Sequence, residues 1–425
     1  MDAPRTVAAG RTASPTTARL INDRLALQLL QSEGALTAGQ LKALTGLSRP
    51  TVADLVERLQ EAGLIAVVGE SGAQRRGPNA RLYGIVADRA HLVGLDLRTH
   101  SVTVAVADLL GEVRAERTVP IGPDDTPDAA VAAALACLDK ALAAAGAPHP
   151  HTIAVGAPGL VDPATGRLGG TDWIPSWHVA LVGELRARRA VPVLLENEVN
   201  LAAIAEQRDG AAGDHDTFVL LWLGHGTGAA VVLDGTLRRG ASGGTGEIGF
   251  LPVPGTAALP SATGCDGGFH SLAGSAAICA LAAQHGLPAE AGAASTAANA
   301  SCPDTDTDAD APPAEAVVRA AVAAGDAGAA FLDALAARIA LGVAAVCAVL
   351  DPGCVVLGGE TGSSGGEELA GRVAGHLARL SPLRTDVRAG ALGGRAVLRG
   401  AVLAARDAAQ NELFGATGPG VSSRP

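Results

Sequence analysis

The sequence has few cysteines and no long apolar run. Its 425 residues include six cysteines, and none of them forms a Cys-x-x-Cys pair or a disulfide-framework spacing. This pattern argues against disulfides and against a zinc site built from thiolates. No run reaches the roughly 18 uninterrupted apolar residues that a membrane span needs, and the N-terminus has no signal-type apolar region. We therefore expect a soluble, cytoplasmic protein with no membrane partner.

Charge is scarce and unevenly distributed. Charged residues make up 18% of the chain, whereas hydrophobic residues make up 48%, and the length predicts two or three domains. Through residue 90 there are 11 Arg and Lys against 8 Asp and Glu, while the remainder has 21 against 35. This asymmetry suggests an N-terminal reader of nucleic acid attached to an acidic body that does not itself bind the phosphate backbone.

Residues 18–88 have the pattern of three helices and a hairpin, after a small, polar segment, 1–17, that we expect to be disordered. The first helix is predicted to bury one apolar face, made of Leu20, Ile21, Leu25, Leu27, Leu29 and Leu30. The second ends at Gly46, and the third follows within four residues. Such a tight connection is typical of a helix-turn-helix.

The third helix has the features of a recognition helix. Ser48 is a good N-cap, and Pro50 lies in the first turn, where its missing N–H is harmless. The spacing predicts a core face of Val52, Leu55, Val56 and Leu59 and an outward face of Arg49, Thr51, Asp54 and Arg58.

A basic hairpin follows the third helix and predicts the wing of a winged helix-turn-helix. We expect Arg49 and Thr51 to reach base edges, and Ser48 with the backbone amides at the helix N-terminus, which includes Pro50, to meet a phosphate. The wing should contact phosphates or a minor groove through Arg75, Arg76 and Arg81. The alternative is a small helical protein-interaction domain with a solvated basic loop.

Residues 89–410 read as a second domain with a repeated pattern. Apolar strands alternate with glycine turns and Ala-rich helices in two similar halves, which implies a duplicated α/β body with a cleft between two lobes. Within it, residues 286–313 are poor in bulky apolar side chains and rich in Ala, Asp, Thr and Pro. We expect that insertion and the tail at 411–425 to be disordered.

Five segments of this body resemble the ROK family of repressors and sugar kinases: "GLDLRTHSVTVAVADLLGEV", "GAPGLVDPATG", "ENEVNLAAIAE", "GHGTGAAVVLDGTLRRGASGGTGEIGF" and "DPGCVVLGGE". The resemblance implies an actin-like or hexokinase-like (ribonuclease H-like) two-lobed ATPase fold. The N-terminal winged helix resembles the transcriptional branch of the family, whose members often respond to xylose or N-acetylglucosamine.

The sequence departs from the kinase members at two positions. Where they have an Asn-Asp pair with a catalytic aspartate, this chain has Asn197 and Glu198, so Glu198 is a degenerate base that we expect to be inactive. Misplacing a reacting group by about 1 Å can cost on the order of 100-fold in rate. The kinases' first phosphate loop is Asp-x-Gly, but Arg98 replaces that glycine after Asp96.

The zinc ligands of the family are also missing. The resemblance places Phe250 at the histidine position and Ala262, Gly264 and Phe269 at the cysteine positions, while Ser271 replaces a sugar-binding glutamate. Cys265 and His270 remain nearby, but two scattered ligands do not make a tetrahedral site. We therefore expect no metal and no cofactor, with both the zinc and the ATP site degraded.

Parts of the ligand sites are retained. The resemblance implies that Asn197, Glu198 and Glu247 bind sugar hydroxyls, and that Asp96, Gly226 and Gly228 are remnants of a nucleotide site. The alternative is that these residues only cap helices and form turns, since tight turns need glycine with or without a nucleotide.

Together these features predict a transcriptional regulator, a repressor that binds a double-stranded DNA operator and senses a sugar or sugar derivative. We expect a homodimer or homotetramer. Two alternatives stay open: an ATP-dependent sugar kinase with a DNA-binding appendage, and a regulator whose body only dimerises.

Overall fold

The computed structural model describes residues 15–71, 80–169, 174–261, 264–287 and 313–415. The chain divides into two compact units, which are described separately below. Unit 1 contains residues 1–91, 108–112 and 406–425, and unit 2 contains residues 92–107 and 113–405.

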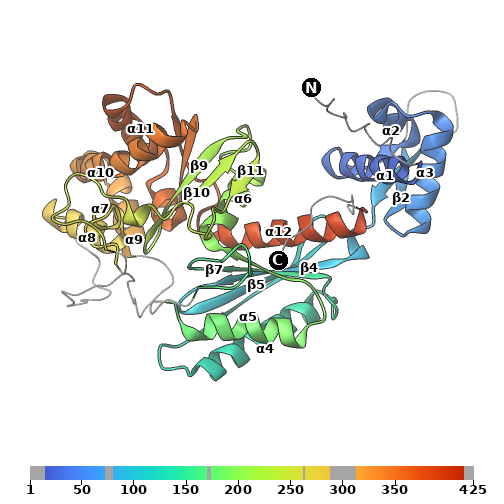
Figure 1. Ribbon diagram of the computed structural model, residues 1–425, viewed down its shortest axis with the longest axis horizontal. Helices are drawn as coiled ribbons and strands as arrows, with labels where there is room; N and C mark the ends of the chain where they lie inside the picture. The colour runs from blue at the N-terminus through green and yellow to red at the C-terminus, as the bar shows by residue number, and fades with distance from the viewer. Residues whose placement is uncertain (1–14, 72–79, 170–173, 262–263, 288–312, 416–425) are drawn as a thin grey trace, which may run out of the picture. The chain divides into compact units, whose positions relative to one another are not determined.

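Unit 1 is a winged helix. Its elements are α1 (Pro15–Ser32), β1 (Leu36–Thr37), α2 (Ala38–Thr45), α3 (Arg49–Glu61), β2 (Ile65–Ser71) and β3 (Ala80–Ile85), drawn in blue in Figure 1. The strands form one antiparallel sheet in the order β1-β3-β2. The wing hairpin therefore consists of β2 and β3, and the expectation of a winged helix-turn-helix is confirmed.

Local capping explains the tight turn between α2 and α3. Thr37 and Gln40 form a reciprocal capping box at the start of α2. Gly46 ends α2 in the left-handed conformation (φ 69°), which only glycine adopts without strain. Ser48 then caps α3 by accepting a hydrogen bond from the amide of Thr51. Stop and start signals thus lie two residues apart.

Two expectations about the start of unit 1 are wrong, one about where order begins and one about which side chains are buried. Helix α1 begins at Pro15, within the segment expected to be disordered, because proline is well suited to the first helical position. Its buried residues are Ala26, Leu27 and Leu30, whereas three apolar side chains expected on the buried face are exposed, namely Leu20, Ile21 and Leu25. Residues 1–14 lie outside the described residues.

The C-terminal helix α12 (Ala396–Leu413) also extends beyond the expected boundary at residue 411. Gln410 donates a hydrogen bond to the carbonyl of Leu109, and Phe414 is buried, so packing within unit 1 favours the last turn. Residues 416–425 and most of the expected insertion, 288–312, lie outside the described residues.

Unit 2 has two lobes with the same sheet order. The first lobe contains β4 (His91–Leu97), β5 (Ser101–Asp108), β6 (Val113–Pro120), α4 (Pro127–Ala144), β7 (Thr152–Ala157), α5 (Ser176–Arg188) and β8 (Val193–Asn197). Its sheet runs β6-β5-β4-β7-β8, with β4, β7 and β8 parallel. Helices α4 and α5 cover one face (Figure 1).

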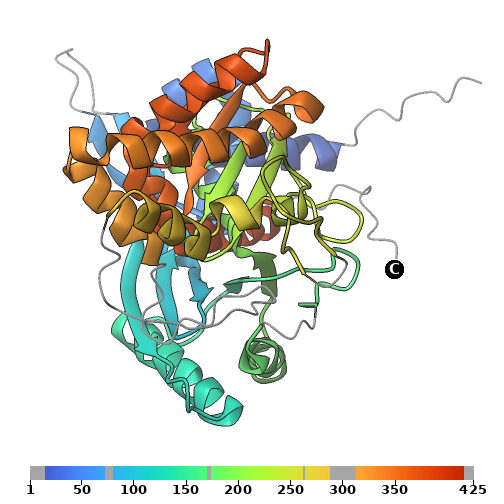
Figure 2. The same ribbon diagram turned by 90° about the vertical axis from the view of Figure 1, so that its left-hand side faces the viewer.

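The second lobe repeats this arrangement. It contains α6 (Glu198–Asp209), β9 (Phe218–Leu223), β10 (Thr227–Leu233), β11 (Thr236–Arg238), α7 (His270–Ala273), α8 (Ser275–Gln284), α9 (Pro313–Ala323), α10 (Asp326–Leu350), β12 (Cys354–Gly358), α11 (Gly359–Leu380) and β13 (Asp386–Ala389). Its sheet runs β11-β10-β9-β12-β13, again with three parallel strands. Figure 2 shows α10 and α11 lying across this sheet. The predicted duplicated, two-lobed α/β body is confirmed.

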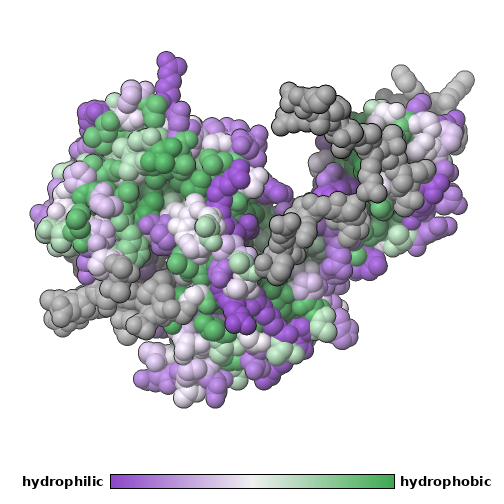
Figure 3. All heavy atoms as spheres, in the orientation of Figure 1, coloured by the Kyte–Doolittle hydropathy of each residue, from purple (hydrophilic) through white to green (hydrophobic). Residues whose placement is uncertain are grey.

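Helix α10 is long and apolar enough to cross a membrane by length and composition alone. Nevertheless Phe331, Leu335 and Ile339 belong to the hydrophobic core of the second lobe, so we read α10 as a core helix. Part of this lobe's surface is hydrophobic in Figure 3, and Val349 at the end of α10 is exposed.

Candidate functional site

The start of α3 presents the residues that the sequence assigns to DNA. Ser48, Arg49 and Pro50 are exposed, and Thr51 is half-buried. The hydroxyl of Ser48 lies 2.8 Å from that of Thr51 and also accepts the Thr51 amide. The four core residues predicted for this helix are all buried. The helix therefore has one buried face and an exposed polar end, as a recognition helix requires.

The other arginines considered in unit 1 differ in whether their side chains are free to contact DNA. Arg81 is exposed on β3, whereas Arg75 and Arg76 lie outside the described residues. Arg58, which was expected to face outward, is half-buried and bound to Asp23 of α1, with its Nη2 2.6 Å from Oδ1. The ion pair explains this correction, because it holds the guanidinium against the neighbouring helix.

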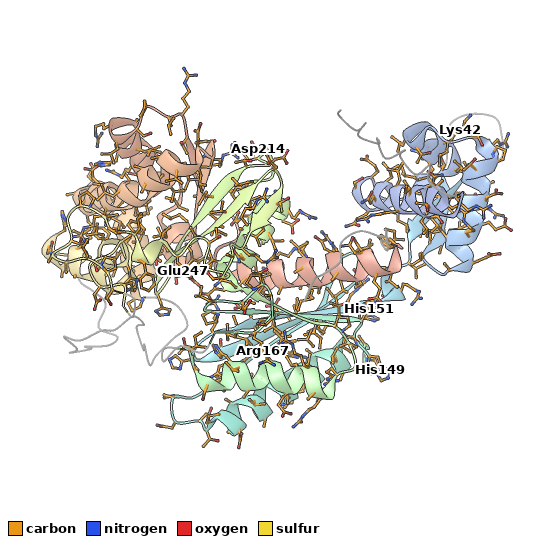
Figure 4. All side chains as sticks on the ribbon, viewed as in Figure 1. Lys42, His149, His151, Arg167, Asp214 and Glu247 are labelled. Atoms are coloured by element: carbon orange, nitrogen blue, oxygen red, sulfur yellow. The ribbon has the colours of Figure 1, made fainter. Side chains whose placement is uncertain are left out.

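Unit 2 contains a cavity of about 220 Å³ between its lobes. The turn after β4, the start of α6, the loop between β9 and β10, and the start of α11 all contribute to its wall. Its charged and amide side chains are Asp96, Arg98, Asn197, Glu198, Glu247 and Glu360. Gly226 and Gly228 also line it, so the structure brings together all the residues assigned to a sugar and a nucleotide remnant. In Figure 4, Glu247 lies at the opposite end of the second lobe's sheet from Asp214.

Asn197 has a structural role at the point where β8 ends and α6 begins. Its side-chain oxygen accepts hydrogen bonds from the amides of Val199 and Asn200, which caps α6. Its Nδ2 donates to the carbonyl of Gly159 at 2.9 Å. A ligand therefore has access to only part of this amide, and its sugar-binding role stays a prediction.

Glu196, one residue earlier, is also committed within the protein. Its carboxylate accepts hydrogen bonds from Arg239 Nε at 2.6 Å and from Asn200 Nδ2 at 2.9 Å. Of the two carboxylates that flank Asn197, only Glu198 lines the cavity.

Glu198 is the most strongly perturbed acid of the cavity. Removal from water, together with the negative charges of Asp96 and Glu360, raises the pKa of Glu198 to about 8, although Arg98 opposes this. Shielding by the surrounding protein also raises the pKa of Glu247, whose side chain keeps exposed surface. Most Glu198 side chains are therefore protonated at neutral pH, when they can donate a hydrogen bond.

Arg98 lies among these acids and bridges them. Its Nε is 3.1 Å from Asp96 Oδ2, and its Nη1 is 3.1 Å from Glu360 Oε1. Its Nη2 donates to the carbonyl of Gly394 at 2.8 Å. Burial alone would lower the pKa of Arg98, but the two carboxylates more than offset this and raise it. Arg98 is thus a permanent cation in the cleft.

The residues at the family's zinc positions do not fit zinc. Phe269 is fully buried in the core of the second lobe and packs against Gly342. Phe250 lines the cavity, and Ser271 accepts a hydrogen bond from the amide of Gly267. In the part of the chain that the structure describes, no three His, Cys, Asp or Glu residues are grouped as metal ligands. Ala262 lies outside that part.

Among the residues of the cavity that sequence reasoning did not assign are Glu360, His225 and Thr227. Glu360 follows the Gly-Gly pair at the end of β12, and only the fold brings it to Arg98. His225 and Thr227 lie in the segment "GHGTG", which was interpreted through its glycines alone. In the described structure, His225 Nδ1 and Thr227 Oγ1 are buried without a hydrogen-bond partner. Polar residues between turn glycines were the signal that could have found them.

The fold and the cleft thus define a winged helix joined to a two-lobed, kinase-like body. Residues 92–408 match the ROK family, and residues 22–77 match the MarR family of winged helices. The chain belongs to the ROK family.

The putative xylose repressor of Caldicellulosiruptor sp. (strain Rt8B.4) is one similar protein. It is 25% identical over 239 residues, which cover 55% of this chain and 59% of the repressor. The match therefore spans less than two thirds of that relative's length.

Two solved structures share the fold. One is a ROK family transcriptional regulator described as a homolog of the Escherichia coli MLC protein: it is 22% identical with a TM-score of 0.71, and the match covers 93% of this chain and 98% of that one. The other is the ROK hexokinase of Thermus thermophilus, 26% identical with a TM-score of 0.58, and the match covers 76% of this chain and 99% of the hexokinase.

Proposed function

We propose that the protein is a DNA-binding transcriptional regulator, a repressor, whose ROK body senses a sugar or sugar derivative. The observation that carries this proposal is that one chain combines an exposed, polar start of α3 with a cavity lined by charged and amide side chains. The name of the xylose repressor supports it, as does the match to the ROK regulator over both units. A ligand that prefers one state of the cleft would change the affinity for an operator.

The proposal includes a body that does not catalyse efficiently and that needs neither zinc nor ATP. The side chains of Arg98 and Glu360 line the same cavity as Gly226 and Gly228, the glycines assigned to a remnant of a nucleotide-binding site. Phe269 contributes to a hydrophobic core at one of the family's zinc positions. We further propose a cytoplasmic homodimer or homotetramer, since two winged helices would match two operator half-sites.

The first test is operator binding. DNA selected from a random library by the full-length protein should contain a recurring motif, and fluorescence anisotropy should give a higher affinity for that motif than for scrambled DNA. Arg49→Ala should reduce this preference, whereas Arg89→Ala, an exposed arginine outside the helix-turn-helix, should not. Equal affinity for motif and scrambled DNA would refute the regulator.

A sugar kinase is the second candidate, and the state of Glu198 favours it. A carboxylate with a pKa near the working pH can act as a general base, and the chain resembles the Thermus hexokinase. Under the regulator proposal, ATP turnover with a panel of hexoses in a coupled assay stays at background in both the wild type and Glu198→Asp. Robust turnover by the wild type would favour the kinase.

A further inference from the structure

Arg98 connects the two lobes of unit 2. It lies in the turn after β4 of the first lobe, whereas Glu360 belongs to the first turn of α11 in the second lobe. Its third partner, the carbonyl of Gly394, lies ahead of α12. The side chains of Arg98 and Glu360 are only 22% and 11% exposed. A pair so shielded from solvent is less screened than a surface ion pair.

Both ends of this connection are held in place. The amide of Arg98 donates to the carbonyl of Ser101 at 3.0 Å, and the fully buried His178 contacts the carbonyl of Arg98 through Nε2 at 3.1 Å. On the other side, the buried carboxylate of Glu206 accepts hydrogen bonds from the amides of Ala391 and Leu392. The loop that presents the Gly394 carbonyl is therefore anchored.

Glu360 occupies a position that suits an anion. It is in the first turn of α11, where an acidic side chain is favoured, and a non-helical Gly366 (φ 55°) separates this short N-terminal stretch from the rest of the helix. The glycine loop after β9 passes beside it: a Cβ atom added to Gly224 would lie 3.3 Å from Glu360 Oε2. A helix N-terminus next to a glycine loop commonly receives a phosphate. Here the chain supplies a carboxylate of its own.

We propose that Arg98 and Glu360 form an interlobe latch that takes the place of a bound anion and holds the cleft together without a nucleotide. The latch goes beyond the proposed function, because it operates whether or not the chain binds DNA. It also predicts a specific asymmetry. Removing Arg98 leaves Asp96 and Glu360 without their shared cation, so repulsion between the two carboxylates should separate the lobes. Neutralising Glu360 in the same protein should relieve that repulsion.

Hydrogen–deuterium exchange on the full-length protein tests the latch. In Arg98→Met, amides of segments 96–101, 358–364 and 390–396 should exchange at least about tenfold faster than in the wild type, because they surround the broken contact. Exchange in α3 should not change. The double variant Arg98→Met/Glu360→Gln should return partway to the wild-type rate. Arg372→Met, which breaks an ion pair with Glu368 inside α11, is the matched control and should leave the three segments unchanged.

Unchanged exchange in Arg98→Met, or a double variant that exchanges faster than Arg98→Met, would overturn the latch. Arg98→Lys, which keeps the cation, should lie between the wild type and Arg98→Met. It keeps the test informative if Arg98→Met folds poorly.

Calorimetry with Mg²⁺ and ADP tests the substitution for an anion. The wild type should bind ADP at least about tenfold more weakly than Glu360→Ala, because that variant removes the carboxylate beside the glycine loop and leaves the Arg98 cation free to pair with a phosphate. Equal or tighter binding by the wild type would overturn this part of the proposal. Neither measurement involves DNA, so failure of the latch and failure of the regulator proposal are distinguishable.

Discussion

The start of α3 and the cleft of unit 2 use charged side chains in opposite ways. At α3, Arg49 is exposed to solvent beside a helix N-terminus whose capping is local. In the cleft, Arg98 and the acids around it contact one another across the fold. The comparison teaches that α3 keeps its charge for an external partner, while the cleft uses much of its charge to hold the protein together. Substitutions should therefore affect binding at α3 and stability in the cleft.

The largest effect is expected for an internal carboxylate near the cleft. Glu206→Ala should lower the free energy of unfolding by about 3–5 kcal/mol, because three amide donors, of Ala211, Ala391 and Leu392, lose their acceptor. Urea denaturation followed by tryptophan fluorescence measures this. Glu116→Ala, an exposed carboxylate on β6, should change stability by less than about 0.5 kcal/mol. Equal losses of stability in the two variants would contradict a structural role for Glu206.

The second effect concerns the dependence of stability on pH. The folded-state pKa of Glu198, about 8, lies above the ordinary 4.5, so the folded state binds the proton more tightly. Stability from this group is present below pH 4.5 and is lost as pH rises through about 8. Glu198→Gln should remove that loss, a gain of roughly 4 kcal/mol at pH 8.5 relative to pH 4. Parallel stability curves for the two proteins would show that Glu198 is not perturbed.

The third effect is on DNA and leaves stability unchanged. Arg49→Ala should weaken binding to the selected operator by about 1–3 kcal/mol if Arg49 contacts a guanine, with little change for scrambled DNA. Anisotropy titrations measure both. An unaltered preference for the operator would remove Arg49 from the recognition surface.

A smaller effect is expected on the wing. Arg81→Ala should weaken binding to every sequence similarly and reduce the slope of log affinity against log salt by about 1, as loss of one phosphate contact does. Titrations at several salt concentrations measure the slope. A change confined to the operator would assign Arg81 to base recognition instead.

The last prediction is that the protein binds no zinc. Dialysed protein should contain no stoichiometric zinc by mass spectrometry, because Phe250 and Phe269 supply no ligand where the family has a histidine and a cysteine. One zinc per chain would show that the loop was matched to the family incorrectly.

The same comparison separates what the sequence could predict from what it could not. The buried face of α3, its Ser48 cap and the end of α2 at Gly46 depend on residues within four positions, so local patterns identified them. The two repeated sheets were also predictable, because each strand is a short apolar run between glycine turns.

Contacts between distant segments were not predictable. Nothing near Arg98 in the chain indicates that Glu360 and Gly394 bind it, and nothing near Arg58 indicates Asp23. The exposed Leu20, Ile21 and Leu25 of α1 show a related limit, because apolar composition alone does not decide which residues a neighbour covers. The residues lining the cleft were predicted through family resemblance, whereas their mutual pairing required the fold.

The central claim is that occupancy of the cleft changes DNA affinity, and one measurement tests it directly. Operator binding is titrated by anisotropy with and without each sugar of a panel, in the wild type and in Glu247→Gln, and calorimetry on the same samples reports sugar binding. We predict that at least one sugar changes the operator affinity of the wild type by about fivefold or more, and that Glu247→Gln reduces this response. A sugar that binds the wild type and leaves its operator affinity unchanged would contradict the account, and a panel in which none binds would favour a body that only dimerises.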